Sequence, residues 1–353
     1  MATRDEHAPP GTTLHSAPLV VPIGGPPVRF GAVAVRGGRV LAVGTRKDLA
    51  ARHPRGRERR WPGMLVAGLV DAHTRLGRAP RPADAAGDLL RHGVVAVGDV
   101  AHDAEHPADP GVVGLGGATY LEVRCPDERT WEETGRDRLI TAIREVALPR
   151  AIGVAAHTRD PGVLEDLAIM ARTFGLRLHA ELAGHQLTVL DETGVLGPHT
   201  HLTHGGRLDT GERKLLRLRG APVALSPLTH PEDVAVLVEE GNAVALHTTP
   251  GEPDLLAAAR VFMAANGRDE RLARAMVEAA TVGGARALGL DEGPGRIGTL
   301  GPGGRADFAV FEVARARRGA YTALVEDGPG RCVATVVGGR VRWDASRPAA
   351  RRS

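Results

Sequence analysis

The middle of the chain alternates between short apolar runs and longer stretches with helical periodicity. Runs of the length of a buried β-strand occur at 65–70, 93–98, 118–123, 151–156, 176–180, 199–204, 221–226 and 242–247. Between them, apolar residues recur every three or four positions over 83–91, 136–147, 163–173, 211–218, 232–240 and 254–265. Strands and helices that alternate in this way predict the α/β class and a (β/α)8 TIM barrel over residues 66–291. A doubly wound open sheet is the alternative, but no GxGxxG motif follows the first run.

Both ends of the chain have a different pattern. Residues 14–65 and 292–345 hold short β-branched runs separated by Gly and Pro, for example 31–35. Such runs predict hairpin strands. Two β-rich ends that flank a helical middle indicate a small composite β-sandwich domain built from both termini. The polar or Arg-rich tails, 1–13 and 346–353, are predicted to be disordered.

Composition excludes several classes of protein. The 353 residues are 42% hydrophobic and 25% charged, which is typical of a globular chain, and the formal net charge is only +3. Arginines are scattered along the sequence, whereas a nucleic-acid surface needs clustered basic residues. No apolar run reaches the roughly 18 residues of a membrane span or resembles a signal peptide. Cys125 and Cys332 lie far apart without CxxC spacing, so reduced cysteines in a cytoplasmic protein are expected.

Candidate functional residues cluster where the predicted barrel strands end. Active-site side chains of a (β/α)8 barrel lie at the C-terminal ends of its strands. Polar residues stand at these ends as follows: Asp71, His73, Arg75, Asp99, His157, His179, Glu181, His204, Ser226, His247, Thr248 and Thr249. Because several histidines converge on one end of the barrel, we predict the functional site there. The other histidines, His201 among them, are expected on loops or helix surfaces.

Several of these segments resemble the amidohydrolase superfamily, in particular its imidazolonepropionase-like and cytosine-deaminase-like aminohydrolase branch. Residues 68–73 resemble the first metal strand of that family, and 178–181 resemble its fifth-strand metal histidine with a neighbouring acid. Residues 202–205 resemble the sixth-strand His-Gly, and 297–307 resemble the segment that re-enters the sheet domain. The resemblance covers nearly the whole chain.

The resemblance implies a hydrolase of C–N bonds other than peptide bonds. It would be a deaminase or a cyclic-amide ring opener whose metal-activated water attacks a small heterocyclic or nucleoside-like substrate. His73, His179 and His204 would hold one divalent metal, and three imidazoles suit zinc. Glu181, His204 and His157 would be the catalytic residues. Relatives of this fold commonly form dimers, so a homodimer is expected.

Two departures from the family pattern fall on key positions. The family has His-x-His on the first strand, but this chain has Arg75 at the second position, and a guanidinium has no lone pair for a metal. The Asp that ends the family's eighth strand corresponds to Thr249, whose hydroxyl is not a base near neutral pH.

These departures leave several roles open. Arg75, His247 and Thr249 are the predicted substrate-binding residues, and Arg75 would hold an anionic part of the substrate. It could instead pair with Asp71 or Glu181, or be a remnant of lost activity. His247 could replace the missing Asp or lie in the core. The alternative to a zinc hydrolase is a metal-free pseudoenzyme or ligand-binding relative, in which Arg75 replaces the metal charge and no cofactor is bound.

Overall fold

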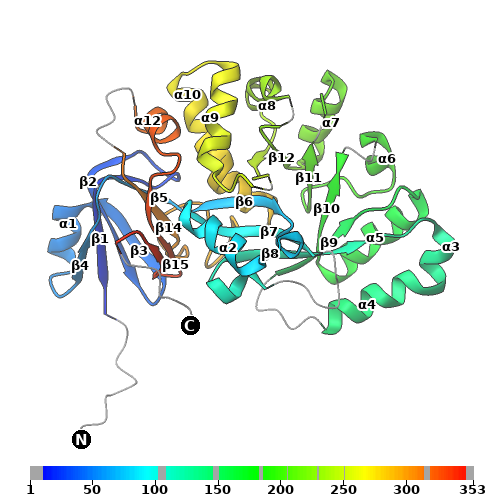
Figure 1. Cartoon of the computed structure of the whole chain (residues 1–353), viewed down its shortest axis with the longest axis horizontal. Coiled ribbons are helices and arrows are strands. Elements are labelled where there is room, and N and C mark those ends of the chain that lie inside the picture. Colours follow the sequence, from blue (N-terminus) through cyan, green and yellow to red (C-terminus); the bar gives the residue numbers. More distant parts are fainter. Residues whose placement is uncertain are drawn as a thin grey trace, which may run out of the picture.

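Two β-sheets organise the chain (Figure 1). The computed structural model describes residues 11–101, 109–145, 151–182, 186–204, 206–228, 230–249, 251–313 and 319–346. One sheet, blue and red in Figure 1, collects strands from both ends of the chain, and the other, cyan to green, forms the barrel. Within the described ranges, every helix is too short or too polar to span a lipid bilayer.

The barrel sheet contains eight parallel strands within the described residues, paired in chain order. They are β6 (Leu69–Thr74), β7 (Val94–Ala101), β8 (Gly116–Val123), β9 (Ala151–Ala156), β10 (Arg177–Glu181), β11 (Thr200–His204), β12 (Val223–Leu225) and β13 (Val244–Leu246). Each predicted apolar run contributes to one of these strands, so the predicted (β/α)8 barrel is confirmed. All eight C-terminal ends open on the same side of the barrel because the strands are parallel.

Helices follow most of the barrel strands, and several begin at an aspartate. The described helices are α1 (Arg46–Arg52), α2 (Pro82–Arg91), α3 (Glu128–Thr130), α4 (Arg136–Glu145), α5 (Pro161–Phe174), α6 (Leu187–Glu192), α7 (Thr210–Arg219), α8 (Val234–Glu239), α9 (Leu255–Asn266), α10 (Glu270–Glu278), α11 (Gly284–Ala287) and α12 (Ala320–Asp327). Asp160, Asp209 and Asp254 accept hydrogen bonds from the first backbone amides of α5, α7 and α9. These N-caps fix where the loops above the barrel end and the helices begin.

The second sheet is built from both ends of the chain. Its strands are β1 (Thr13–Val21), β2 (Val28–Arg36), β3 (Arg39–Thr45), β4 (Arg57–Arg60), β5 (Met64–Ala67), β14 (Phe308–Phe311), β15 (Cys332–Val337) and β16 (Arg340–Asp344). The antiparallel pairing of β5 with β14 joins the N-terminal and C-terminal parts. The predicted composite origin of this domain is therefore confirmed, with the strands hydrogen-bonded as one sheet.

The predicted strand at 65–70 is divided between the two sheets. Met64–Ala67 belongs to the composite sheet, and the barrel begins at Leu69. Gly68 lies between them and donates its backbone N–H to Asp307 at 3.0 Å. A Cβ at Gly68 would lie 2.4 Å from Cγ1 of Val95, so only glycine fits this close approach. A continuous apolar run does not reveal such a transfer between sheets.

Side chains join the first and last barrel strands. The buried carboxylate of Asp71 on β6 accepts hydrogen bonds from the backbone N–H of Thr248, at 3.2 Å, and from its hydroxyl, at 2.5 Å. It also accepts the backbone N–H of His73 at 3.1 Å. Burial raises the pKa of Asp71 to about 7, although these hydrogen bonds act in the opposite direction. Asp71 is therefore a structural residue of the seam between β6 and β13.

Candidate active site

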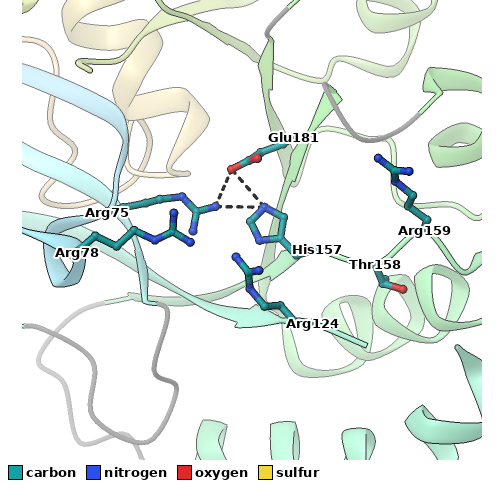
Figure 2. Close-up of a pocket in the computed structure, with 7 residues that line it drawn as sticks. All are labelled: Arg75, Arg78, Arg124, His157, Thr158, Arg159 and Glu181. Carbon is teal, nitrogen blue, oxygen red and sulfur yellow. Dashed lines mark hydrogen bonds and ion pairs between the residues drawn. The ribbon is translucent and has the colours of Figure 1, made fainter. Parts of the chain in front are cut away.

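An ion-paired cluster lies where four barrel strands end. Arg75 follows β6, Glu122 lies near the end of β8, His157 follows β9, and Glu181 ends β10. Arg75 donates from Nη1 to Oε1 of Glu122 at 2.5 Å and from Nη2 to Oε1 of Glu181 at 2.6 Å. Figure 2 shows Arg75, His157 and Glu181 pointing toward one another from separate elements. One guanidinium therefore joins two carboxylates from different strands.

His157 contacts every other member of this cluster. Its Nδ1 lies 2.6 Å from Oε1 of Glu122, and its Nε2 lies 3.2 Å from Oε1 of Glu181 and 3.1 Å from Nη2 of Arg75. With a proton on Nδ1 alone, His157 donates to Glu122 and accepts from Arg75. With both nitrogens protonated, it donates to Glu122 and to Glu181. Each protonation state has hydrogen-bond partners, which suits an imidazole that takes up and releases a proton.

The charges of the cluster hold Glu181 in its ionised form. The hydrogen bond from His157 lowers the pKa of Glu181 to about 2, and Arg75 adds to this effect against the opposing effect of burial. Glu122 has a fully buried side chain and also accepts Nε of Arg124 on Oε2 at 2.6 Å. Burial acts to lower the pKa of Arg75, but the hydrogen bonds and ion pairs with both glutamates together raise it. Arg75 is therefore a permanent cation.

The cluster opens into a basic cavity of about 360 Å³, within the size range of small-molecule sites. Its lining residues are Arg75, Arg78, Arg124, His157, Thr158, Arg159 and Glu181 (Figure 2). Arg78 and Arg159 are exposed at the rim, and neither forms a salt bridge with another described residue. Four arginines against Glu181 and the buried Glu122 leave an excess of positive charge, so the cavity favours an anionic group.

A layer of buried aromatic rings lies inside the barrel next to this cluster. The rings of His73 and His179 stack with centroids 4.8 Å apart and planes 17° apart, and His247 meets His73 edge-on at 5.4 Å. His201 lies 4.8 Å from His179, and its Nδ1 is 3.2 Å from the hydroxyl of Tyr120. The prediction that His201 lies on a loop or helix surface is wrong, because it is fully buried in β11.

Burial keeps this histidine layer neutral. It lowers the pKa of His73 and of His179 well below the ordinary value, and neighbouring positive groups add to the effect. Burial also lowers the pKa of His201 to about 3 and lowers that of His247. The Nδ1 atoms of His73 and His179 are buried and have no hydrogen-bond partner within the described residues.

The structure places two other predicted site residues apart from this cluster. His204 ends β11, and alternation along the strand turns it away from the side that carries His201 and Thr203. Burial lowers the pKa of His204 to about 4, and its charged neighbours are Asp233 and His230. Thr249 forms an isolated backbone bridge with Glu252. Its neighbour Thr248 supplies the hydroxyl at the seam with Asp71.

The residues present do not form the three-histidine metal site that the resemblance implies. His73 and His179 lie together, but His204 has other neighbours. Within the described ranges, no group of three or more His, Cys, Asp or Glu side chains is placed to hold one metal ion. The guanidinium of Arg75 stands close enough to lower the pKa of His73 and would repel a cation there. The three predicted ligands are therefore not brought together around one point.

Glu122 and Arg124 are site residues that the sequence patterns did not indicate. Glu122 lies at the end of the run at 118–123, whose pattern predicts only a buried strand, and Arg124 directly follows that run. An ionisable residue inside an apolar strand of a barrel is itself a signal, because a buried charge needs a partner. Alternation puts Glu122 and Arg124 on the same side of the chain.

Family models match most of the chain. The amidohydrolase family model matches residues 93–342, and the model of the bacterial imidazolonepropionase-like composite domain matches residues 31–55. The second match lies in the composite sheet, within β2, β3 and the residues that follow them. The amidohydrolase match spans the barrel from β7 onward and the C-terminal strands of the composite sheet.

Two curated proteins with the same name match the chain in sequence. The 5-methylthioadenosine/S-adenosylhomocysteine deaminase of Natronomonas pharaonis is 26% identical over 297 residues, and the match covers 72% of this chain and 65% of that protein. The protein of the same name from Syntrophobacter fumaroxidans is 31% identical over 191 residues, or 49% of this chain and 40% of that protein. The chain thus spans 65% and 40% of the length of these relatives.

A crystal structure of an adenosine deaminase from Xanthomonas campestris with bound zinc has the same fold. The superposition has a TM-score of 0.77 and 20% sequence identity, and it covers 96% of this chain and 94% of the adenosine deaminase. Because the amidohydrolase model alone covers more than half of the sequence, this chain belongs to the amidohydrolase family.

Proposed function

We propose that this chain is a hydrolase that acts on a C–N bond, other than a peptide bond, in a small heterocyclic or nucleoside-like amine. The observation that carries the proposal is His157, held by the buried Glu122 at 2.6 Å, with its other nitrogen in the wall of the cavity. A base held by a buried carboxylate and directed into a cavity is the arrangement that general acid–base catalysis requires. The two relatives named as deaminases support this class of reaction.

His157 is the proton carrier in this proposal. A carboxylate whose pKa is about 2, as for Glu181, is a weak base, so Glu181 instead accepts a hydrogen bond from the substrate's amino group. As the water oxygen bonds to the ring carbon, one proton of the water passes to Nε2 of His157, which returns it to the ring nitrogen. The remaining hydroxyl proton moves to the amino group as the C–N bond breaks. The products are a ring carbonyl and ammonia.

The excess of arginine favours a substrate with an anionic group. Arg75 is held by Glu122 and Glu181, so the exposed Arg78 and Arg159 at the rim are the residues available for a carboxylate or phosphate. The relative from Natronomonas pharaonis is named for a substrate that carries an amino-acid side arm, S-adenosylhomocysteine. Zinc belongs to the neighbour from Xanthomonas campestris, and the residues of this chain do not fit the family's zinc site.

Ammonia release tests the proposal. The protein is incubated with 5-methylthioadenosine, S-adenosylhomocysteine, adenosine and guanine, and ammonia is measured by a coupled assay. We expect turnover of at least one substrate by the wild type and a loss of roughly 100-fold or more in His157→Gln. His199→Gln is the matched control, because His199 is exposed just before β11, at the opposite end of the barrel. Equal rates in His157→Gln and the wild type would refute the role of His157.

A second candidate function is ligand binding without turnover. The ion pairs of Arg75 with both glutamates favour ligand binding without turnover, because they engage the carboxylates that would otherwise act on a bound substrate. Calorimetric titration with the same compounds distinguishes the two functions. Binding that is abolished in Arg78→Ala, together with no ammonia release by the wild type, would support the ligand-binding relative and exclude the hydrolase for these compounds.

A further inference from the structure

We infer that the guanidinium of Arg75 takes the electrostatic place of the family's metal ion. It is the fixed cation that assembles Glu122, His157 and Glu181, and the site is complete without a metal. This inference concerns what holds the site together, so its tests do not depend on whether the proposed hydrolysis occurs.

The position of Arg75 supports the inference. It directly follows β6, two residues after His73, at the mouth of the barrel. From β6 its side chain reaches groups on β8 and β10, and its Nη2 also lies 3.1 Å from His157. Only 16% of the side chain is exposed. A single central cation that joins ligand groups from several strands is what a metal ion provides in a barrel of this kind.

The acceptors of the cluster are already engaged by hydrogen-bond donors. Oε1 of Glu122 accepts Arg75 and the imidazole of His157, and Oε2 accepts Arg124. Oε1 of Glu181 accepts Arg75 at 2.6 Å and lies 3.2 Å from His157. A divalent ion would have to displace these donors, and the guanidinium cannot lose its charge to make room.

The buried carboxylate of Glu122 is held by cations. Its side chain is fully buried and pairs with both Arg75 and Arg124, and the loss of one partner of a buried ion pair is strongly destabilising. Arg75 is therefore expected to stabilise the fold through its charge, which an arginine that is a remnant of lost activity would not do. Arg78 offers a matched comparison, because it lines the same cavity without a salt bridge to another described residue.

Two measurements on the full-length protein test the inference. The first is metal content after expression in zinc-supplemented medium and purification without chelator. We expect less than about a tenth of an equivalent of zinc, iron or manganese and an unchanged Tm in EDTA. About one equivalent of metal, or a Tm that falls in EDTA, would overturn the inference even if no variant folds.

The second measurement is a thermal-unfolding cycle with Arg75→Met, Glu181→Gln and the double variant. We expect Arg75→Met to lower the Tm by roughly 5 °C or more, while Arg78→Met leaves it within about 1 °C. The double variant is expected to be less destabilised than the sum of the single variants, because each single variant already breaks the ion pair between Arg75 and Glu181. Equal Tm values for Arg75→Met and Arg78→Met, or strictly additive losses, would contradict the inference.

Discussion

The carboxyl group of Asp71 is expected to make stability depend on pH in an unusual direction. Burial raises the pKa of Asp71 from 3.8 to about 7 in the folded protein. Between these two values the folded state binds a proton that the unfolded state has released. The contribution of Asp71 to stability is therefore greatest at low pH, and it falls as the pH rises toward 7. Asp71→Asn removes this dependence because the amide does not titrate.

The expected size follows from the two pKa values. A pKa difference of one corresponds to about 1.4 kcal/mol. From pH 5 to pH 8, ionisation of Asp71 continues to stabilise the unfolded state, while the folded state benefits only above its pKa of about 7. The wild type should therefore lose roughly 2.5 kcal/mol of unfolding free energy relative to Asp71→Asn over this interval.

Urea unfolding at several pH values measures this difference. The free energy of unfolding is determined for wild type and Asp71→Asn at pH 5, 6, 7 and 8, and the difference is plotted against pH. Asp84→Asn is the control for replacing a carboxyl by an amide outside the seam, because the side chain of Asp84 is 66% exposed at the start of α2. A flat difference for Asp71→Asn, or the same pH dependence in both variants, would refute the assignment of a raised pKa at the seam.

Two further substitutions test how the sheets are joined. Gly68→Ala should lower the free energy of unfolding by about 1–3 kcal/mol, because the new Cβ would lie 2.4 Å from Cγ1 of Val95. Gly87→Ala in α2 is the control and should not destabilise the protein, because a Cβ there would have no atom within 4 Å. Equal effects of the two substitutions in urea unfolding would contradict the close approach. Thr335→Val should cost about 1 kcal/mol in the same assay, because the buried Thr335 hydroxyl donates to the carbonyl of Leu90 at 2.6 Å and joins β15 to α2. Thr173→Val, which removes an exposed bond within α5, is the control, and an equal effect of both would argue against a bond between β15 and α2.

The architecture could be predicted because its signals are local. Apolar runs bounded by Gly, Pro and polar residues mark strands, and helical periodicity marks the connections between them. The division at Gly68 could not be predicted, because an uninterrupted apolar run suits either sheet and only the contact with Val95 distinguishes them. The sequence thus predicts the elements better than the points where the chain passes from one sheet to the other.

The candidate site could be predicted only in part. The sequence indicates Glu181 as one partner of Arg75, and the structure shows that ion pair. It leaves the partner of Glu122 open, because the run at 118–123 predicts only a buried strand and Arg75 meets Glu122 only when β6 and β8 are placed in the barrel. His201 was missed for a related reason, since its burial depends on the register that sets it opposite His179. Contacts between strands, rather than motifs within them, decide which polar residues form the site.

Ammonia release in the presence of a chelator tests the central claim most directly. The substrate that gives turnover is assayed with the wild-type protein after dialysis against EDTA, and again after zinc is added back. We predict equal rates in both conditions and a rate reduced by roughly 100-fold in His157→Gln. A rate that disappears in EDTA and returns with zinc would contradict the central claim, because a metal ion would then hold the place that we assign to Arg75.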